Sequence, residues 1–254
     1  MSVGGTDFSA LSGPRARGAA GDAVGENRAM SDDAARAASP FEIETLDAAT
    51  LVEDGDLWRL YEAAFPDDER EPREVVVRSL ELGVGLALRA RRGGRTSGLA
   101  LAHLLRDPAA VFLVYLAVDP NARGWGLGRA LFEETWARGA ERLRAAERTP
   151  LGLVWEVDER PDAAGAARGS LAARTAFFAR QGGAALPGPY VQPPIAGPLP
   201  IPMRLFFRAT PEARGPFDRA FARRLARALH VEKYGAVNGL ARETLDALRD
   251  ESPD

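Results

Sequence analysis

The chain has 254 residues, of which 46% are hydrophobic and 27% charged, a composition typical of one large globular domain or a domain with appendages. A net charge of −3 gives no basic field for nucleic acid, and the lack of cysteine excludes disulfides and thiolate catalysis. The two histidines, His103 and His230, are too far apart to indicate a metal site, and no apolar run approaches the roughly 20 residues that span a bilayer. Because the N-terminus also lacks a signal-peptide pattern, we expect a cytoplasmic protein with no metal, nucleic-acid partner or membrane association.

Residues 1–40 are rich in Ala, Gly, Ser, Asp and Arg and show no apolar period, which predicts a disordered tail. Met30 precedes Ser31-Asp32-Asp33, so we hypothesise that it is an alternative start, which N-terminal sequencing would decide. Order is expected to begin at residues 41–46, where alternation predicts a strand.

The remaining apolar patterns predict helices and strands in alternation, separated by Gly/Pro-rich turns. The expected helices are 48–64, 73–82, 126–146, 169–180, 215–229 and 238–249, and the expected strands are 83–90, 97–105, 110–118, 151–157 and 203–207. A charged loop, residues 65–72, is bracketed by prolines. This order predicts an α/β fold with a mixed sheet.

The clearest chemical signal is Arg123-Gly124-Trp125-Gly126-Leu127-Gly128, at the end of the strongest predicted strand. Closely spaced glycines allow the backbone to approach a ligand, and their N–H groups at a helix start form a site for phosphate or pyrophosphate. The guanidinium of Arg123 adds a positive charge that can donate two hydrogen bonds to the same anion. A tight strand–helix turn without a ligand is the alternative.

Other phosphate-binding patterns fit this segment less well. A Walker loop needs Gly-Lys-Ser/Thr, which is absent from residues 127–130. The dinucleotide pattern Gly-x-Gly-x-x-Gly also fails. If it starts at Gly124, its third glycine falls on Arg129, and if it starts at Gly126, its third glycine falls on Leu131. The pattern that fits is Arg-x-x-Gly-x-Gly after Val-Asp-Pro.

Residues 116–131 closely resemble the coenzyme A motif of the GNAT superfamily of N-acetyltransferases, Gln/Arg-x-x-Gly-x-Gly/Ala. Residues 174–183 resemble the family's helix ending in Phe-Tyr-x-x-x-Gly-Phe, and residues 57–72 look like its first helical pair and loop. The resemblance covers 41–208 as an acyltransferase domain. It leaves 209–254 as a C-terminal helical extension with two open roles, a homodimer contact or a cap on the sheet.

The resemblance implies a mixed, largely antiparallel central sheet flanked by helices, with acetyl-CoA as co-substrate. The pyrophosphate is then expected on the N–H groups of residues 124–129, and pantetheine beside strand 111–118 where it separates from strand 151–157. An exposed N–H near this splay is expected to stabilise the oxyanion, and the amine to attack directly. The implied cofactor-binding residues are Leu116, Ala117, Val118, Arg123, Gly124, Trp125, Gly126, Leu127, Gly128, Arg129 and Phe177.

Glu156 is the candidate general base, because apolar neighbours on a central strand are expected to raise the pKa of its carboxyl. A structural carboxylate paired with an arginine is the alternative. The family's tyrosine acid falls on Phe178 here, so that assignment fails. Tyr190 is a substitute proton donor, Tyr115 is another candidate, and solvent is the third.

Glu69 and Arg70 lie in the loop that the resemblance places beside the acceptor, so they are candidate substrate-binding residues. A solvated charged loop is the alternative. His103 is expected to pack or to face solvent, and the arginines of the 215–229 helix are expected to form a solvated basic face.

Three functions remain open at this point. The first is acetyl transfer from acetyl-CoA to the primary amine of a small molecule or peptide. The second is a non-catalytic acyl-CoA sensor or interaction module of the same fold, which Phe178 and the extension favour. The third is another nucleotide or phosphate enzyme that uses the same turn.

Overall fold

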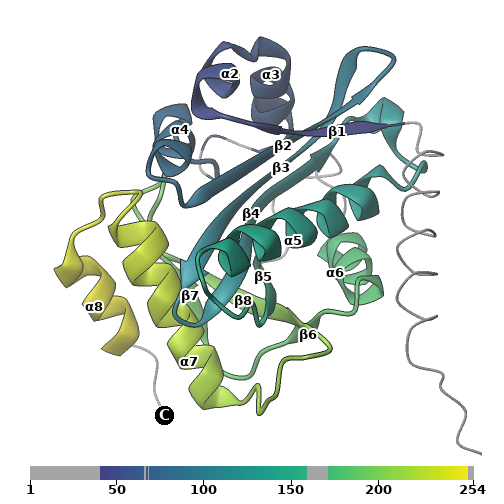
Figure 1. The fold of residues 1–254 in the computed structure, drawn as a ribbon. Coiled ribbons are helices and arrows are strands. Elements are labelled where there is room, and N and C mark those ends of the chain that lie inside the picture. Colours follow the sequence, from purple (N-terminus) through teal and green to yellow (C-terminus); the bar gives the residue numbers. More distant parts are fainter. Residues whose placement is uncertain (1–40, 66, 68, 159–170, 251–254) are drawn as a thin grey trace, which may run out of the picture. The chain divides into compact units, whose positions relative to one another are not determined.

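The computed structural model describes residues 41–65, 67, 69–158 and 171–250 (Figure 1). The predicted tail, Met30 and the first residues of the predicted 169–180 helix lie outside this part of the chain.

Within the described residues, eight strands form one sheet in the order β1-β2-β3-β4-β5-β8-β6, and β7 pairs with β8. The strands are β1 (Glu42–Leu46), β2 (Gly85–Arg92), β3 (Arg95–Arg106), β4 (Ala109–Val118), β5 (Gly152–Asp158), β6 (Ala184–Ala185), β7 (Tyr190–Gln192) and β8 (Ile201–Ala209). All neighbours are antiparallel except β4 and β5, so the sheet is mixed and largely antiparallel.

A bulge in β4 divides that strand into two halves. The register with β3 pairs Leu101 with Tyr115 but Ala102 with Leu113, so Val114 is the extra residue. Side chains alternate between the two faces of a sheet with a period of two residues. The extra residue therefore moves every later side chain of β4 to the face opposite the one it would otherwise occupy. The parallel ladder with β5 ends at Leu113 and Trp155, although both strands continue. The strands therefore part just beyond the bulge.

One face of the sheet is covered by α5 (Leu127–Ala145) and α6 (Leu171–Arg180). Leu131, Phe132 and Leu143 of α5 pack in one core cluster with side chains from β2 to β5. Trp155 joins the same cluster from β5, and Phe178 packs against it from α6.

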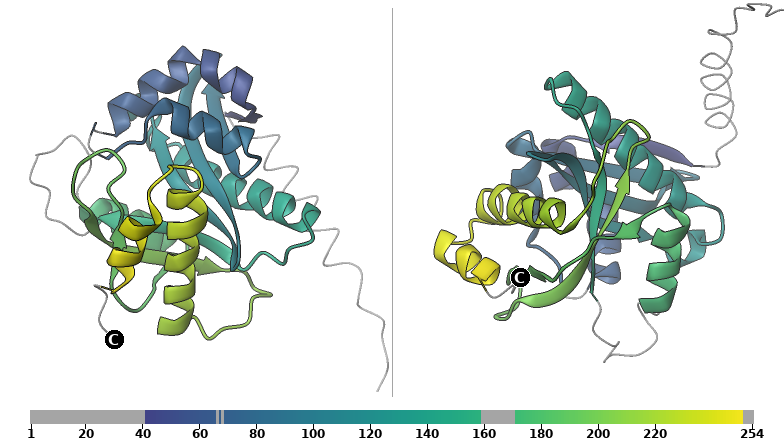
Figure 2. Two further views of the ribbon diagram at one scale, coloured as in Figure 1. Left: turned by 90° about the vertical axis from the view of Figure 1, so that its left-hand side faces the viewer. Right: turned by 90° about the horizontal axis from the view of Figure 1, so that it is seen from below.

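The opposite face carries two groups of helices (Figure 2). The first group is α2 (Ala48–Glu53), α3 (Gly55–Ala64) and α4 (Arg73–Glu81), and the second is α7 (Arg219–Ala228), the π-helix η2 (Leu229–Gly235) and α8 (Arg242–Asp250). The first group packs over β1 to β4, and the second packs over β4, β5, β7 and β8. Their boundary crosses β4 at Val114, which packs against both clusters.

Local hydrogen bonds explain where the helices differ from expectation. The predicted 48–64 helix is two helices, because the Asp54 carboxylate caps a new helix by accepting the N–H of Leu57 at 3.0 Å. The predicted 215–229 helix begins only at Arg219, since Asp218 caps it by accepting the N–H of Phe221 at 3.0 Å. After α7 the chain continues into η2, and the last helix is 242–250 rather than 238–249.

Candidate functional site

The glycine-rich segment lies between β4 and α5. A short 3-10 helix, η1 (Pro120–Ala122), leads into it, and both Gly124 (φ +84°) and Gly126 (φ +80°) have left-handed backbones. A Cβ atom at either glycine would meet nothing within 4 Å, so the conformation, not crowding, requires glycine here. The turn thus presents bare backbone to the surface.

Gly126 is the N-cap of α5, and no side chain caps this helix. The first helical hydrogen bond is the one from the N–H of Ala130 to the carbonyl of Gly126. The N–H groups of residues 127–129 therefore lack intrahelical partners and lie at the positive end of a 19-residue helix. Its first turn contains no acidic residue that would repel an anion.

Side chains around this turn leave its backbone accessible. Arg123, Trp125 and Arg129 are exposed, and the Arg92 guanidinium lies over the Trp125 ring at 4.0 Å. Phe177 comes from α6 to the same helix start, where its ring lies 3.5 Å from the position of a Cβ on Gly128. The structure thus brings the predicted residues of this loop and Phe177 together.

The outer half of β4 borders the gap between the strands. Leu116 and Val118 point to the α5 face and are part-buried, whereas Ala117 points to the other face and is buried. Beyond Leu113 none of them pairs with β5 in the described ladder. This strand edge leads from the bulge at Val114 to the glycine turn.

Glu156 lies on the opposite face from α5. Val154 packs under α7, and the period of two places Glu156 on the same side. Its carboxylate accepts hydrogen bonds from the Tyr190 hydroxyl and, at 2.7 Å, from Gln192 Nε2; the Tyr234 hydroxyl lies 2.9 Å from both oxygens. These partners, and not an arginine, hold Glu156.

Burial raises the pKa of Glu156, hydrogen bonds from Tyr190, Tyr234 and Gln192 lower it, and the charge of Glu71 raises it; the net shift is upward. Burial and the Glu156 charge hold the pKa of Tyr190 and of Tyr234 well above their usual value. Both phenols therefore stay protonated and donate to the carboxylate. A buried carboxylate with a raised pKa has the features of a proton acceptor in an active site.

Glu71 is a second buried carboxylate beside this cluster, 2% exposed. Its Oε1 accepts from Lys233 Nζ at 2.5 Å and from Asn238 Nδ2 at 2.7 Å, while Lys233 also donates to Asn238 Oδ1 at 3.0 Å. The backbone N–H of Glu71 donates to the Tyr115 hydroxyl at 2.8 Å. The 65–72 loop is thereby fixed to β4 and to the C-terminal extension.

The predicted acceptor residues Glu69 and Arg70 shape this loop. Arg70 donates to the carbonyls of Glu62 and Phe65, at 3.2 and 3.1 Å, and pairs with Asp67. The carbonyl of Glu69 accepts from the Tyr115 hydroxyl at 3.3 Å. The neighbouring Glu71 is the residue of this loop whose carboxylate lies beside the Glu156 cluster.

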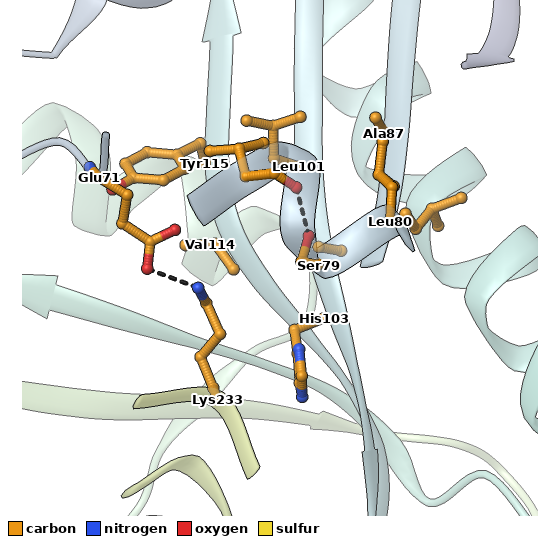
Figure 3. Close-up of a pocket in the computed structure, with 12 residues that line it drawn as sticks. Glu71, Ser79, Leu80, Ala87, Leu101, His103, Val114, Tyr115 and Lys233 are labelled. Atoms are coloured by element: carbon orange, nitrogen blue, oxygen red, sulfur yellow. Dashed lines mark hydrogen bonds and ion pairs between the residues drawn. The ribbon is translucent and has the colours of Figure 1, made fainter. Parts of the chain in front are cut away.

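His103 on β3 is buried beside Lys233 (Figure 3). Within the described part of the chain neither ring nitrogen has a hydrogen-bond partner. Burial, reinforced by the charges of Lys233 and Arg106, lowers the pKa of His103 to about 3. An enclosed space of about 10 Å³, room for about one water molecule, separates His103 from Tyr115, Ser79 and Val114.

A larger, open hollow of about 570 Å³ lies beside the cluster on β7 and β8. Residues 186–191 and 202–204 line it, and Tyr190 belongs both to this lining and to the Glu156 cluster. A molecule in the hollow would therefore reach the cluster through Tyr190.

Phe178, at the position of the expected tyrosine, lies on the α5 side of the sheet. Its ring stacks on Trp155 at 4.9 Å and 29°. Trp155 and Glu156 are successive residues of one strand and point to opposite faces, so the Phe178 ring and the Glu156 carboxylate are on different sides.

Sequence reasoning missed several members of the cluster. One signal was present: Lys233 is the only lysine in a chain whose other basic residues are arginines. The missed residues are Glu71, Gln192, Lys233, Tyr234 and Asn238. They come from three separate parts of the chain, the 65–72 loop, β7 and the segment around η2, so no local pattern in the sequence joins them.

In the described residues, no group of three or more His, Asp or Glu side chains is placed to hold a metal ion. In the same part of the chain, no helix combines the length and the apolar character needed to cross a membrane.

Comparison with known proteins gives a family for the central part of the chain. Residues 55–153 match the sequence profile described as the acetyltransferase (GNAT) family. No curated protein sequence matches the chain.

One solved structure shows the fold, and two others are reported for their similarity alone. A putative acetyltransferase from the GNAT family of Bacteroides thetaiotaomicron is 19% identical with a TM-score of 0.56, and the match covers 76% of this chain and 98% of that one. Arabidopsis thaliana NAA60 in complex with acetyl-CoA is 14% identical with a TM-score of 0.49, covering 66% and 98%. An aminoglycoside 6'-acetyltransferase type Ii is 15% identical with a TM-score of 0.48, covering 66% and 96%.

Proposed function

Because the chain carries an acetyltransferase domain of the GNAT family, matched over residues 55–153, we propose that it transfers an acetyl group from acetyl-CoA to a primary amine by direct attack in a ternary complex. The observation that carries this proposal is the start of α5. There, the free N–H groups of residues 127–129 follow two left-handed glycines, next to a strand that has parted from its neighbour.

The residues present fit coenzyme A. In this proposal, the pyrophosphate binds the N–H groups of residues 124–129 together with Arg123, since this helix start is uncapped and free of acidic side chains. The pantetheine arm lies along Leu116, Ala117 and Val118, whose backbone edge is open toward β5, and adds to β4 as a strand would. Phe177 and Trp125 border the site.

The acceptor amine is proposed to approach from the other face, beside Glu156. Its nitrogen attacks the thioester carbonyl, a C–N bond forms, and the C–S bond breaks. The amine's proton passes to Glu156, directly or through one water, and the departing thiolate takes a proton from Tyr190 or solvent. A backbone N–H at the Val114 bulge is the proposed donor to the oxyanion.

Tyr190→Phe separates the two sources of the thiolate's proton. If Tyr190 supplies it, kcat falls at every pH. If Tyr190 only donates to Glu156, the loss concentrates at low pH, because the pKa of Glu156 rises when a hydrogen bond to its ionised form is removed. The pH profile of kcat decides between them.

We propose residues 41–208 as the acyltransferase domain and 209–254 as its extension, with Glu69 and Arg70 shaping the acceptor loop. The acceptor would occupy the hollow beside Tyr190.

The test is a screen of amines with acetyl-CoA in which released thiol is counted, together with acetyl-CoA binding by calorimetry. Arg123→Ala is expected to weaken binding without changing the fold, since Arg123 is exposed. A protein that binds no acetyl-CoA at millimolar concentration would contradict the proposal. Preferential binding of NAD or ATP would instead favour another phosphate enzyme.

One observation favours a second candidate function, a non-catalytic acyl-CoA sensor. Phe178 stands where the family's tyrosine acid is expected, and it cannot donate a proton. Tight binding of acetyl-CoA without thiol release across the amine panel would select this alternative.

A further inference from the structure

The C-terminal extension returns to the sheet and contributes two adjacent residues to the buried cluster. Lys233 and Tyr234 lie in η2, the π-helix that follows α7, and they are 2% and 1% exposed. The i to i+5 hydrogen bond from the N–H of Asn238 to the carbonyl of Lys233 measures 3.2 Å. Single π-turns of this kind are frequent at functional sites.

The two side chains contact different carboxylates. Lys233 binds Glu71, which is 162 positions away in the sequence, and Tyr234 binds Glu156, which is 78 positions away. Figure 3 shows Lys233 extending from the C-terminal extension to the Glu71 carboxylate. One turn of helix thus bridges the loop before α4 and the end of β5.

Stability alone is a poor explanation for the Lys233–Glu71 pair. Both side chains are 2% exposed, and removing two charges from water costs about as much as their attraction returns, so apolar replacements of similar size are often as stable. Asn238 adds one hydrogen bond to each group, which helps to define the geometry of the pair.

We propose that Lys233 and Tyr234 are positioning residues of the acyl-transfer site, through which the C-terminal extension holds Glu71 and Glu156 at the acceptor side. The inference rests on the proposed function for its catalytic readout. The paired contacts that carry it do not depend on that function.

The charge of Glu156 depends on every group that faces it. These groups are Tyr190 and Gln192 from β7, Tyr234 from η2, and Glu71 from the 65–72 loop. Behind them, Lys233 of η2 pairs with Glu71, and His230 of η2 packs against Tyr190. Tyr234 favours the ionised form of Glu156 by hydrogen bonding and the charge of Glu71 opposes it, while Lys233 forms an ion pair with Glu71.

The first experiment uses the fact that Lys233 is the only lysine. Labelling with [13Cε]lysine gives one side-chain NMR signal from the full chain, and it requires no activity. We expect the signal to move in Glu71→Gln and in Asn238→Ala, and to stay in place in Arg227→Ala, on the exposed face of α7. A signal insensitive to Glu71→Gln would overturn the proposed role of Lys233.

The second experiment measures kcat/KM against pH for an amine that the wild type acetylates. The acid limb of this profile is the fall of kcat/KM toward low pH. In Tyr234→Phe it is expected to move to higher pH by about one unit, because the ionised Glu156 carboxylate loses a hydrogen bond. Thr135→Val is the matched control: it removes an equally buried hydroxyl, which donates to the carbonyl of Leu131 within α5 and not to any member of the cluster. Its acid limb is expected to stay in place.

Lys233→Met leaves the Glu71 charge uncompensated, so its acid limb is also expected to move to higher pH. The double variant Glu71→Gln/Lys233→Met carries neither charge, and its limb should return toward the wild-type position. Limbs that stay fixed in both Tyr234→Phe and Lys233→Met, with only a uniform loss of rate, would overturn the positioning role. If the wild type acetylates no amine, the proposed function fails, while the lysine signal still tests the pairing.

Discussion

The start of α5 and the buried cluster on the opposite face are built in different ways. The α5 start is made of backbone: six consecutive residues, 123–128, with two left-handed glycines and unpaired N–H groups. The cluster is made of side chains from the 65–72 loop, β5, β7 and η2, joined by hydrogen bonds. A backbone site tolerates most changes of side chain, whereas a side-chain cluster depends on each member, and this difference predicts how each region fails.

The largest effect is expected at Glu156. Glu156→Gln keeps the size of the side chain but removes the proton acceptor, so kcat should fall by about 10²–10⁴-fold, the usual contribution of a general base. Thiol release under saturating acetyl-CoA measures it. Binding of acetyl-CoA should stay unchanged, because the α5 start is on the other face. An activity near that of the wild type would exclude Glu156 as the base.

The second effect concerns the pH dependence of stability near the cluster. Burial lowers the pKa of His103 to about 3, below its unfolded value, so the stability it contributes is present above pH 6.5 and is lost as pH falls toward 3. Between pH 7.5 and pH 5 this loss amounts to about 2 kcal/mol, since the slope is about 1.4 kcal/mol per pH unit below 6.5.

His103→Leu removes this titration while keeping a side chain of similar size. Urea unfolding at pH 7.5 and pH 5 should then show a difference smaller than that of the wild type by about the same amount. An unchanged difference would mean that His103 titrates normally in the folded protein.

The third effect tests the backbone site. Gly126→Ala forces a Cβ onto a backbone at φ +80° at the N-cap of α5, so the N–H groups should shift and acetyl-CoA affinity should fall about tenfold. Gly94→Ala is the matched control, with φ +77° in the β2–β3 turn and no neighbour within 4 Å. Both variants should lose similar stability, but Gly94→Ala should bind acetyl-CoA normally. Equal affinities in the two variants would contradict a pyrophosphate site at α5.

The same contrast explains what the sequence could predict. The family, the mixed sheet and the glycine turn were predicted because strand alternation and closely spaced glycines are local patterns. Glu156 and Tyr190 were both predicted as candidates, but the other partners of Glu156, Gln192 and Tyr234, were not. Tyr234 is 78 positions from Glu156, and the contact exists only because η2 folds back over β5.

The 65–72 loop, next to β4, shows a second reason why the sequence alone could not predict the cluster. Glu69 and Arg70 were predicted as substrate-binding residues because the resemblance places their loop beside the acceptor, whereas Glu71 is the residue held at the cluster. Tyr61 and Tyr115 form hydrogen bonds with the loop backbone at Glu71. These bonds decide which of the three neighbouring charged residues points inward. Those bonds require the tertiary fold, so sequence spacing alone cannot select the residue.

The smallest effect is expected at Phe178. It tests which face of the sheet supplies the proton that the departing thiolate takes up. The ring lies on the α5 side, stacked on Trp155, and is separated by the sheet from Glu156 and Tyr190. Restoring the family's tyrosine with Phe178→Tyr should therefore change kcat by less than about threefold, which is under 1 kcal/mol in the barrier. A tenfold or larger increase would show that the α5 side supplies the thiolate's proton, and Tyr190 would then act on Glu156 alone.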